Sequence, residues 1–457
     1  MSSCLHQVVA FFEGGGGNRV FVRPAKAVQL KGETEFKGER RNVMGRRVGL
    51  WTTICVLVLM AGLVMFPGEG SAKTVYVGGT MSLTGPYAED SAAILAAYED
   101  YVKYVNETKH LAPWRNDTWP ADVTVELLWR DDELKPAKAL SIYEELKAKG
   151  ILVYRASGSP TALALKDRLK QDGFGAPSMS TGSFLMKPPG TILTYYPLYT
   201  DDLAAVGDWF KEKWKENRKP RVAYLSADNA MGKSIEIPEM EAYLKKIGYE
   251  FVGTQYVPLV PTSPPTTQLM WLKQNTVDLA VGIMVNPGSQ PTVKEMVRLG
   301  MGPYQSYKIT FACGTPSHLP VFAAAMGELG DGFVVAGGFP PWDEPSPGVK
   351  FMTDLQKKYH PNKWVSHSQY MGGFIEAMTQ IEALRLAMQK TPLEKLKPID
   401  VLNDGFYQIK NFDTGAISST PLTYGPGKIE GVDKVRIDQL QKGKVVKQGV
   451  YPCHGIY

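Results

Sequence analysis

The chain has 457 residues, of which 44% are hydrophobic and 21% charged, which is typical of a protein with two or three globular units. The formal net charge of +5 arises mostly in residues 1–72, because the remaining sequence carries 42 basic and 41 acidic residues. A nearly neutral body excludes the broad basic surface that binding to nucleic acid requires, so no nucleic-acid partner is expected.

The first predicted element is an export signal. Arg46 and Arg47 lead into an almost wholly apolar run, Leu50–Phe66, and small residues follow as far as Ala72. A basic segment, an apolar segment and a small-residue cleavage site are the three parts of a secretory signal, so we predict a signal peptide over residues 44–72. A retained membrane anchor is the alternative, because the apolar run is at the short end of what spans a bilayer.

Export would place the mature part of the chain in the periplasm. Residues 1–43 show no periodicity, and we interpret them as a mis-called N-terminal extension, with Met44 as the true start. The mature part contains two cysteines, Cys313 and Cys453, which an oxidising compartment allows to pair. Pairing requires Cα atoms within bonding distance, so a disulfide and two separate thiols both stay open.

From residue 73 onward, predicted strands alternate with predicted helices. Runs rich in β-branched and aromatic residues predict strands, and apolar residues at helical spacing predict helices. A first series has strands at 73–80, 123–129, 151–154, 177–180 and 192–196 and helices at 88–106, 136–149 and 161–171. A second series has strands at 221–226, 250–257, 278–284 and 308–313 and helices at 201–217, 232–247, 267–274 and 292–299. A long helix follows at 366–389, and the last 30 residues are β-rich.

Strands that alternate with helices indicate parallel sheets built from β-α-β units. Because the rhythm restarts near residue 200, the sequence predicts an α/β protein with two doubly wound parallel-sheet lobes. Ligands of such open sheets bind outside the carboxyl ends of the strands, so the loops after the strands are the candidate site.

Five segments carry a resemblance to a known family: Val77–Ala88, Trp129–Asp132, Ala156–Thr161, Val222–Gly232 and Tyr370–Ala377. In order and spacing they resemble type I periplasmic solute-binding proteins of ABC importers, in the branched-chain amino acid and amide branch (Leu/Ile/Val-binding protein-like). The resemblance covers nearly the whole mature part.

The resemblance implies two lobes joined by a three-segment hinge. Lobe one would combine residues 73–199 with 333–425, and lobe two would combine 200–332 with 426–457. Such lobes close around a small-molecule ligand, and the closed form docks onto a permease of the inner membrane. A monomer without cofactor or metal is expected.

The loop after the third predicted strand offers Ser157, Ser159 and Thr161 at the start of a helix. Free backbone N–H groups and the helix dipole favour an anion there, and the resemblance assigns this loop to the carboxylate of a ligand. The alternative is that Ser159 or Thr161 only caps its helix.

Further candidates come from four other loops. Gly182 and Ser183 match the second ligand loop of the family, although a plain polar turn is equally compatible with them. Tyr87 follows the first strand, where it could stack on a ligand or form a wall. Asn286 and Thr315 follow two strands of the second lobe.

The second lobe departs from the family pattern. Met231 stands where a tyrosine is common, and the loop Ala312–Pro316 has no acid for the ammonium group of a ligand. Because a buried ammonium without a charged partner is costly, these differences put an α-amino acid in doubt and make an amide or an organic acid plausible.

No motif indicates catalysis. The sequence contains no phosphate-binding loop, no nucleophile elbow and no metalloprotease signature, and its six histidines are scattered. Asp131 and Asp132 are read as a solvated strand end, because consecutive strand residues face opposite ways. The leading hypothesis is therefore solute capture for an importer. A sensor that feeds a signalling partner and, less favoured, a secreted α/β enzyme are the alternatives.

Overall fold

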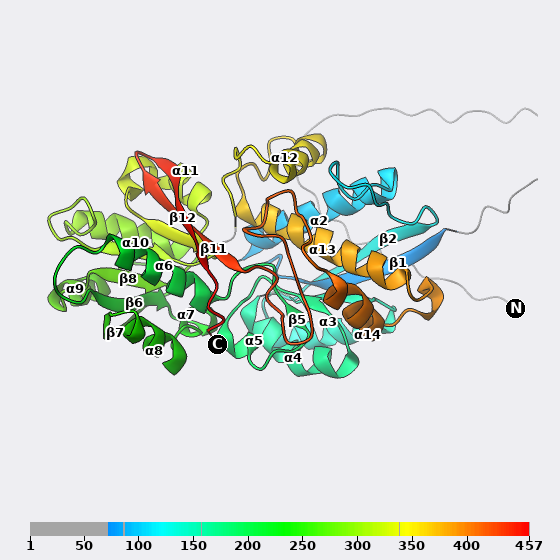
Figure 1. The fold of residues 1–457 in the computed structure, drawn as a ribbon, viewed down its shortest axis with the longest axis horizontal. Coiled ribbons are helices and arrows are strands. Elements are labelled where there is room, and N and C mark those ends of the chain that lie inside the picture. The colour runs from blue at the N-terminus through cyan, green and yellow to red at the C-terminus, as the bar shows by residue number, and fades with distance from the viewer. Residues whose placement is uncertain (1–71, 86, 157, 338, 457) are drawn as a thin grey trace, which may run out of the picture. The chain divides into compact units, whose positions relative to one another are not determined.

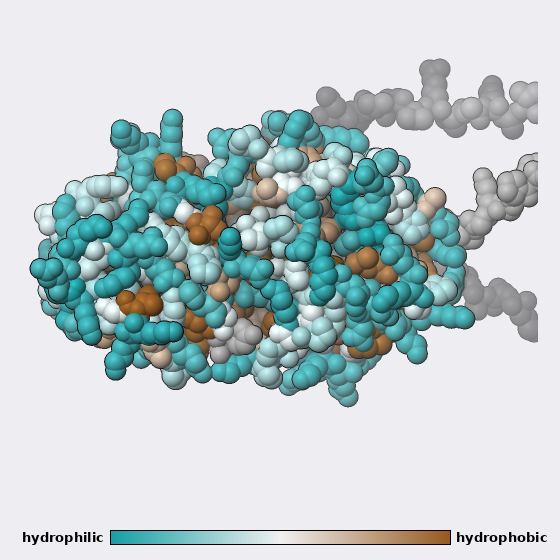
Figure 2. Space-filling view, viewed as in Figure 1, coloured by the Kyte–Doolittle hydropathy of each residue, from teal (hydrophilic) through white to brown (hydrophobic). Residues whose placement is uncertain are grey.

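The computed structural model describes residues 72–85, 87–156, 158–337 and 339–456, which belong to one compact unit, Glu69–Tyr457 (Figure 1). The predicted extension and almost all of the predicted signal peptide lie outside the described residues, as does Ser157. Within the described part, none of the helices has the length and apolarity needed to cross a membrane. On the face that Figure 2 shows, the described residues are mostly hydrophilic, and the hydrophobic ones form small separate patches.

The unit contains two separate hydrophobic cores. The first gathers buried residues from Val75–Leu198 and Val349–Val432, and the second gathers them from Tyr199–Ala336 and Val435–Ile456. We call the parts around these cores lobe one and lobe two. On this packing we propose that the chain crosses between lobes at Tyr199, just after Gly337 and after Val432. The last two positions are a few residues later than the sequence-based boundaries.

Lobe one is built on a parallel sheet with strand order β2-β1-β3, which a single bridge, Ala156 to Ser178, extends to the pair β4-β5. The strands are β1 (Lys73–Met81), β2 (Val123–Asp131), β3 (Val153–Arg155), β4 (Ala176–Pro177) and β5 (Ile192–Leu193). The helices are α2 (Ala88–Thr108), α3 (Pro136–Ala148), α4 (Ser159–Asp172), α5 (Ser183–Met186), α12 (Pro347–Tyr359), α13 (Ser368–Met388) and α14 (Pro398–Asp400), with short helical turns at Leu393–Lys395, Val401–Gly405 and Phe406–Gln408. The helix α13 is buried almost all round and packs along α2, as expected for a helix without a polar face.

Lobe two has a seven-stranded sheet with order β12-β11-β10-β9-β8-β6-β7, in which β6 to β10 are parallel and β11 and β12 antiparallel. The strands are β6 (Arg221–Ala227), β7 (Glu250–Val257), β8 (Leu279–Gly282), β9 (Thr310–Cys313), β10 (Val334–Gly337), β11 (Lys434–Gln441) and β12 (Lys444–Pro452). The helices are α6 (Tyr199–Lys213), α7 (Ala230–Lys233), α8 (Pro238–Lys246), α9 (Thr266–Gln274), α10 (Asn286–Arg298) and α11 (Leu319–Met326), with a 3-10 turn at Gly327–Gly330.

These sheets confirm the predicted α/β fold class, with local differences. The single helix predicted over 232–247 is two helices, because Pro238 starts a new helix at its first turn and cannot continue the preceding one. The two cysteines that the sequence left open, Cys313 and Cys453, are both free thiols.

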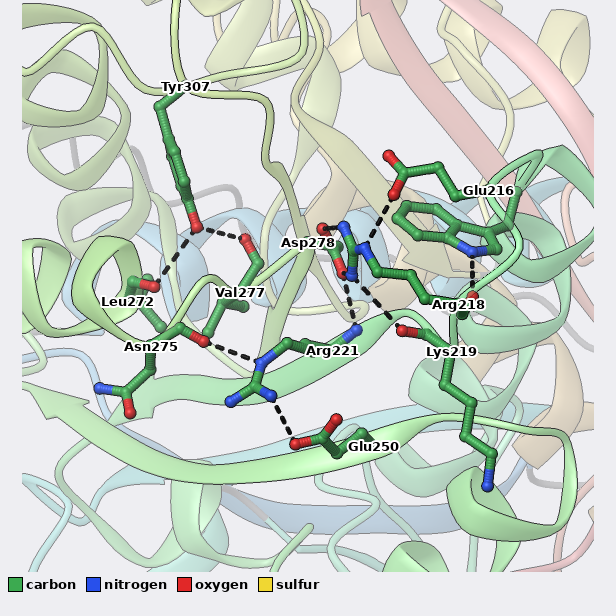
Figure 3. A network of polar contacts seen from close by, with 11 residues as sticks. Glu216, Arg218, Lys219, Arg221, Glu250, Leu272, Asn275, Val277, Asp278 and Tyr307 are labelled. Carbon is green, nitrogen blue, oxygen red and sulfur yellow. Dashed lines mark hydrogen bonds and ion pairs between the residues drawn. The ribbon is translucent and has the colours of Figure 1, made fainter.

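A polar network closes the amino ends of the lobe-two strands (Figure 3). The carboxylate of Asp278 accepts hydrogen bonds from both terminal nitrogens of Arg218, at 2.6 and 2.7 Å. It also accepts one from the backbone N–H of Arg221, at 2.8 Å. The Arg221 side chain also pairs with Glu250 at the start of β7. The network therefore ties together the starts of β6, β7 and β8, at the end of the sheet opposite to the candidate site.

Candidate functional site

A cavity of about 310 Å³ is lined by residues of both lobes at the carboxyl ends of the strands. In lobe one β1 lies between β2 and β3, and in lobe two β6 lies between β7 and β8. The strands that follow β1 and β6 in the chain are therefore added on opposite sides of them. Such switch points leave a crevice between adjacent loops, which is where open α/β sheets bind ligands. The lining residues are Ser82, Tyr87, Asp90, Ser91, Ile94, Leu134, Arg155, Gly158, Ser159, Pro160, Met179, Ser180, Tyr196, Tyr199, Asn229, Ala230, Met231, Leu259, Val285, Thr315, Pro316 and Gln369.

The main charged group of the cavity wall is Arg155, the last residue of β3, which sequence reasoning missed. Its side chain is 3% exposed and its Nε lies 3.3 Å from the carboxylate of Glu376 on α13, which is fully buried. Its Nη1 donates to the carbonyl oxygen of Thr80, at 3.2 Å, and Tyr195 donates to Glu376, at 2.9 Å. Among the described residues, the Nη2 of Arg155 has no hydrogen-bond partner. The buried pair thus holds a guanidinium at the cavity with donor capacity left over.

The start of α4 forms the wall next to Arg155. Ser159 is the first residue of this helix and lines the cavity, and no side chain of the described residues caps the helix. Thr161 is fully buried and does not line the cavity, because its hydroxyl donates to the carbonyl oxygen of Gly158, at 2.9 Å. The first turn of α4 therefore lies beside the cavity at Ser159, whereas the N–H and the hydroxyl of Thr161 both donate to the carbonyl oxygen of Gly158.

The second predicted ligand loop contacts the other lobe. Ser183 donates from its hydroxyl to the carbonyl oxygen of Ser234, at 2.6 Å, and Lys187 pairs with Glu239 at 3.0 Å. Neither Gly182 nor Ser183 is among the lining residues; Met179 and Ser180, a few positions earlier, are. This loop thus joins the two lobes at the edge of the cavity.

Lobe two contributes an almost uncharged wall. Thr315 lines the cavity, and its N–H and hydroxyl both donate to the buried Asp202, each at 2.8 Å. Asn286 is turned away: its amide nitrogen donates to the carbonyl of His318 and its oxygen accepts from the N–H of His318, each at 3.1 Å. Met231 does line the cavity, at the position where the family often has tyrosine.

Tyr87 faces lobe two across the cavity. It stands at the start of α2 and lines the cavity together with Asn229 of lobe two. Burial raises the pKa of its hydroxyl to about 12, so the group is a neutral hydrogen-bonding phenol at physiological pH. The structure places Tyr87 in the wall of the cavity, and its contact with a ligand stays a prediction.

Two further polar side chains at the cavity were missed by sequence reasoning. Burial raises the pKa of Asp90, in the first turn of α2, to about 6, and its nearest ionisable partner is His367, at 3.7 Å. Gln369, near the start of α13, meets the His318 ring nitrogen at 2.5 Å, and its amide oxygen is buried without a hydrogen-bond partner among the described residues. Both residues lie in the first turn of a helix, whereas the sequence-based candidates were chosen at the ends of strands.

The interpretation of Asp131 and Asp132 as a solvated strand end is wrong for Asp132. Asp132 is fully buried and accepts a hydrogen bond from the hydroxyl of Ser82, at 2.7 Å. Asp131 accepts from the N–H of Leu83 and the hydroxyl of Thr84, each at 2.9 Å. Both acids therefore hold the loop after β1 that leads to Tyr87.

Comparisons with known proteins agree with this architecture. A family model described as periplasmic binding protein matches residues 74–415. A branched-chain amino acid ABC transporter protein of Thermus thermophilus with bound valine is 21% identical, with a TM-score of 0.72 over 84% of this chain and 97% of that one. A solute-binding protein of Rhodopseudomonas palustris BisB5, in complex with 3,4-dihydroxybenzoic acid, is 19% identical, with a TM-score of 0.66 over 83% and 98%.

A fatty acid ABC transporter substrate-binding protein of Thermomonospora curvata is 20% identical, with a TM-score of 0.68 over 84% of this chain and 93% of that one. At these identities the likeness concerns the fold. No curated protein matches the sequence.

Proposed function

The chain belongs to the periplasmic binding proteins, in the Leu/Ile/Val-binding type I family, and on that premise we propose that it captures a small organic carboxylate for an ABC importer. The observation that carries the proposal is the guanidinium of Arg155 at the cavity wall, with Nη2 unpaired among the described residues. A guanidinium binds carboxylates through directed, charge-assisted hydrogen bonds.

Three features beside Arg155 support an anionic group at this wall. The start of α4 at Ser159 brings the positive end of a helix dipole to this wall. Ser159 and Ser180 add hydroxyls from neighbouring loops. Glu376 holds Arg155 in place from the side of the core, so the arginine needs little reorganisation when the ligand binds.

The rest of the wall favours an apolar or aromatic body on the ligand. Tyr87, Tyr196 and Tyr199 are three aromatic lining residues. Aliphatic or thioether side chains come from both lobes: Ile94, Leu134, Met179, Met231, Leu259 and Val285. A mostly apolar cleft with a few convergent polar groups is typical of small-molecule sites, in which the polar groups fix the orientation.

A second candidate is a ligand that carries an ammonium group as well as a carboxylate. Asp90 favours it, because this largely buried acid lines the cavity, and the described residues provide no Lys or Arg to pair with it. An ammonium group in the cavity would lower the pKa of Asp90 and be held by it. The acid that the sequence lacks in lobe two would then be supplied by lobe one.

The transport role follows from the family. Periplasmic binding proteins are exported, bind small molecules and work with ABC permeases, and we propose the same for this chain as a monomer with a signal peptide over residues 44–72. A sensor would require a signalling partner in place of the permease, and an enzyme would require a nucleophile and base at the cavity.

Isothermal titration calorimetry tests the proposal and separates its two candidates. The panel pairs two acids with their amides, 4-hydroxybenzoate with 4-hydroxybenzamide and valine with valinamide. It also pairs valine with isovalerate, a carboxylate that lacks the ammonium group. We expect binding of at least one carboxylate and none of its amide. Preference for valine over isovalerate would favour the ammonium-bearing ligand, and the reverse order the plain acid. Equal binding of acid and amide would contradict the role of Arg155.

A further inference from the structure

Three potential metal ligands meet where the chain crosses between the lobes. They are Asp201 at the start of α6, Glu430 in the segment before β11, and Cys453 just after β12. One carboxylate oxygen of each acid and the sulfur of the cysteine all lie within 4.8 Å of one another. The three side chains thus come from three different segments, and none of them lines the ligand cavity.

The backbone holds these groups in place. The Oδ1 of Asp201 accepts from the N–H groups of His454 and Gly455, at 2.5 and 2.9 Å. Glu430 accepts from the N–H of Leu198, at 3.2 Å, and its carboxylate lies within 4.8 Å of the Cys453 sulfur. The site is therefore built from both the first and the third crossing segment and from the C-terminal segment.

Asp201 has an oxygen that the protein does not satisfy. Its side chain is fully buried, and its Oδ2 has no hydrogen-bond partner among the described residues. A buried carboxylate oxygen without a partner is costly, so this atom indicates a group that the described residues do not supply.

The cluster also lacks a counter-charge. Two basic side chains close to the cluster in sequence are paired with other acids, since Lys428 pairs with Asp433 and His454 pairs with Asp208 at 2.8 Å. No Lys or Arg of the described residues forms an ion pair with Asp201 or Glu430.

We propose that Asp201, Glu430 and Cys453 bind a divalent transition-metal ion of the zinc type at the hinge, with water completing the coordination. A thiolate beside two carboxylates favours zinc over magnesium or calcium, which prefer oxygen ligands alone. The ion would neutralise the acids and join the crossing segments, and so stabilise the hinge. No metal was expected from the sequence, because these three residues are too far apart in the chain to form a recognisable spacing motif.

Metal binding to the full-length chain tests this proposal independently of solute capture. After treatment with a chelator, the protein is dialysed against Zn²⁺ and its metal content is measured, and in parallel it is titrated with Co²⁺, whose absorption reports thiolate coordination. We expect one Zn²⁺ per chain and a thiolate-to-cobalt charge-transfer band. Cys453→Ser should abolish the band and weaken Zn²⁺ binding by more than about tenfold.

Cys313→Ser is the matched control, because Cys313 is a buried thiol outside the cluster, and it should keep the ion and the band. Cys4 and Cys55 are present in every variant, so the difference between variants isolates Cys453. Asp201→Asn provides a second variant that leaves all thiols in place, and it should weaken Zn²⁺ binding while circular dichroism stays unchanged. Less than stoichiometric Zn²⁺ in the wild type, or an unchanged cobalt band in Cys453→Ser, would overturn the proposal.

Discussion

Charged side chains at the two ends of the strands differ in whether the protein satisfies their hydrogen bonds. At the amino ends of lobe two, Asp278 receives three hydrogen bonds from two arginines, and the network is satisfied within the protein (Figure 3). At the carboxyl ends, the Nη2 of Arg155 has no hydrogen-bond partner among the described residues. The difference indicates that polar groups at the amino ends stabilise the fold, whereas those at the cavity are available to a ligand.

The largest effect is expected at the buried pair of the cavity. Arg155→Met removes the charge that we assign to carboxylate binding and leaves Glu376 buried and unpaired, so it should abolish binding and cost about 3–5 kcal/mol of stability. The double variant Arg155→Met/Glu376→Gln should recover most of the stability without recovering binding. Urea unfolding and calorimetry measure the two effects. A double variant that binds like the wild type would contradict the assignment.

At the opposite end, Asp278→Asn should lower stability without a change in affinity. The side chain is 10% exposed and bonds the guanidinium of Arg218, so we expect a loss of about 1–3 kcal/mol in the free energy of unfolding. Glu250→Gln is the control: its pair with Arg221 is half-exposed, and its loss should stay below about 1 kcal/mol. A clear change in ligand affinity in Asp278→Asn would break the comparison between the two ends.

Asp90 should make the stability of the ligand-free chain depend on pH. Burial raises its pKa from 3.8 to about 6, so between these values the folded chain binds more protons than the unfolded one. This group therefore contributes stability at low pH, and the contribution falls as the pH rises towards 6. The difference in unfolding free energy between the wild type and Asp90→Asn should follow that trend between pH 4 and 7. A difference independent of pH would show that Asp90 is not desolvated at the cavity.

The smallest effect is expected at the contact between lobes. Ser183→Ala removes the hydrogen bond to Ser234, which joins the two lobes, at a cost of about 1 kcal/mol. Ligand affinity should fall by about fivefold, because the ligand must then close the lobes without that contact. Ser306→Ala is the control, since its hydroxyl bonds Gly300 within lobe two. Equal effects of the two variants on affinity would contradict a role in closure.

The sequence predicts the parallel sheets well, but it predicts less well which side chains line the cavity. The alternation of elements predicted parallel sheets, and the rule that ligands bind at strand ends placed Tyr87, Ser159 and Thr315 at the cavity. The same rule also selected Thr161 and Asn286, whose polar atoms bond nearby backbone instead. A sequence shows which end of a strand a residue follows but not which way its side chain turns.

The missed residues have a different cause. Arg155 lies between the predicted strand 151–154 and the loop that begins at Ala156, and only the distant Glu376 on α13 explains how a buried arginine is held at the cavity. Gln369 reaches the cavity because α13 packs along α2, although the two helices are far apart in the chain. Contacts between segments this far apart leave no local pattern in the sequence, so they emerge only from the fold.

The most direct test of the account is a crystal structure with a carboxylate that calorimetry has identified. The central claim is that the ligand's acid group binds to lobe one. Its oxygens should lie within hydrogen-bond distance of the Arg155 guanidinium and the start of α4 at Ser159, with the apolar body towards Met231. A carboxylate held by lobe two, with no contact to Arg155, would contradict the claim.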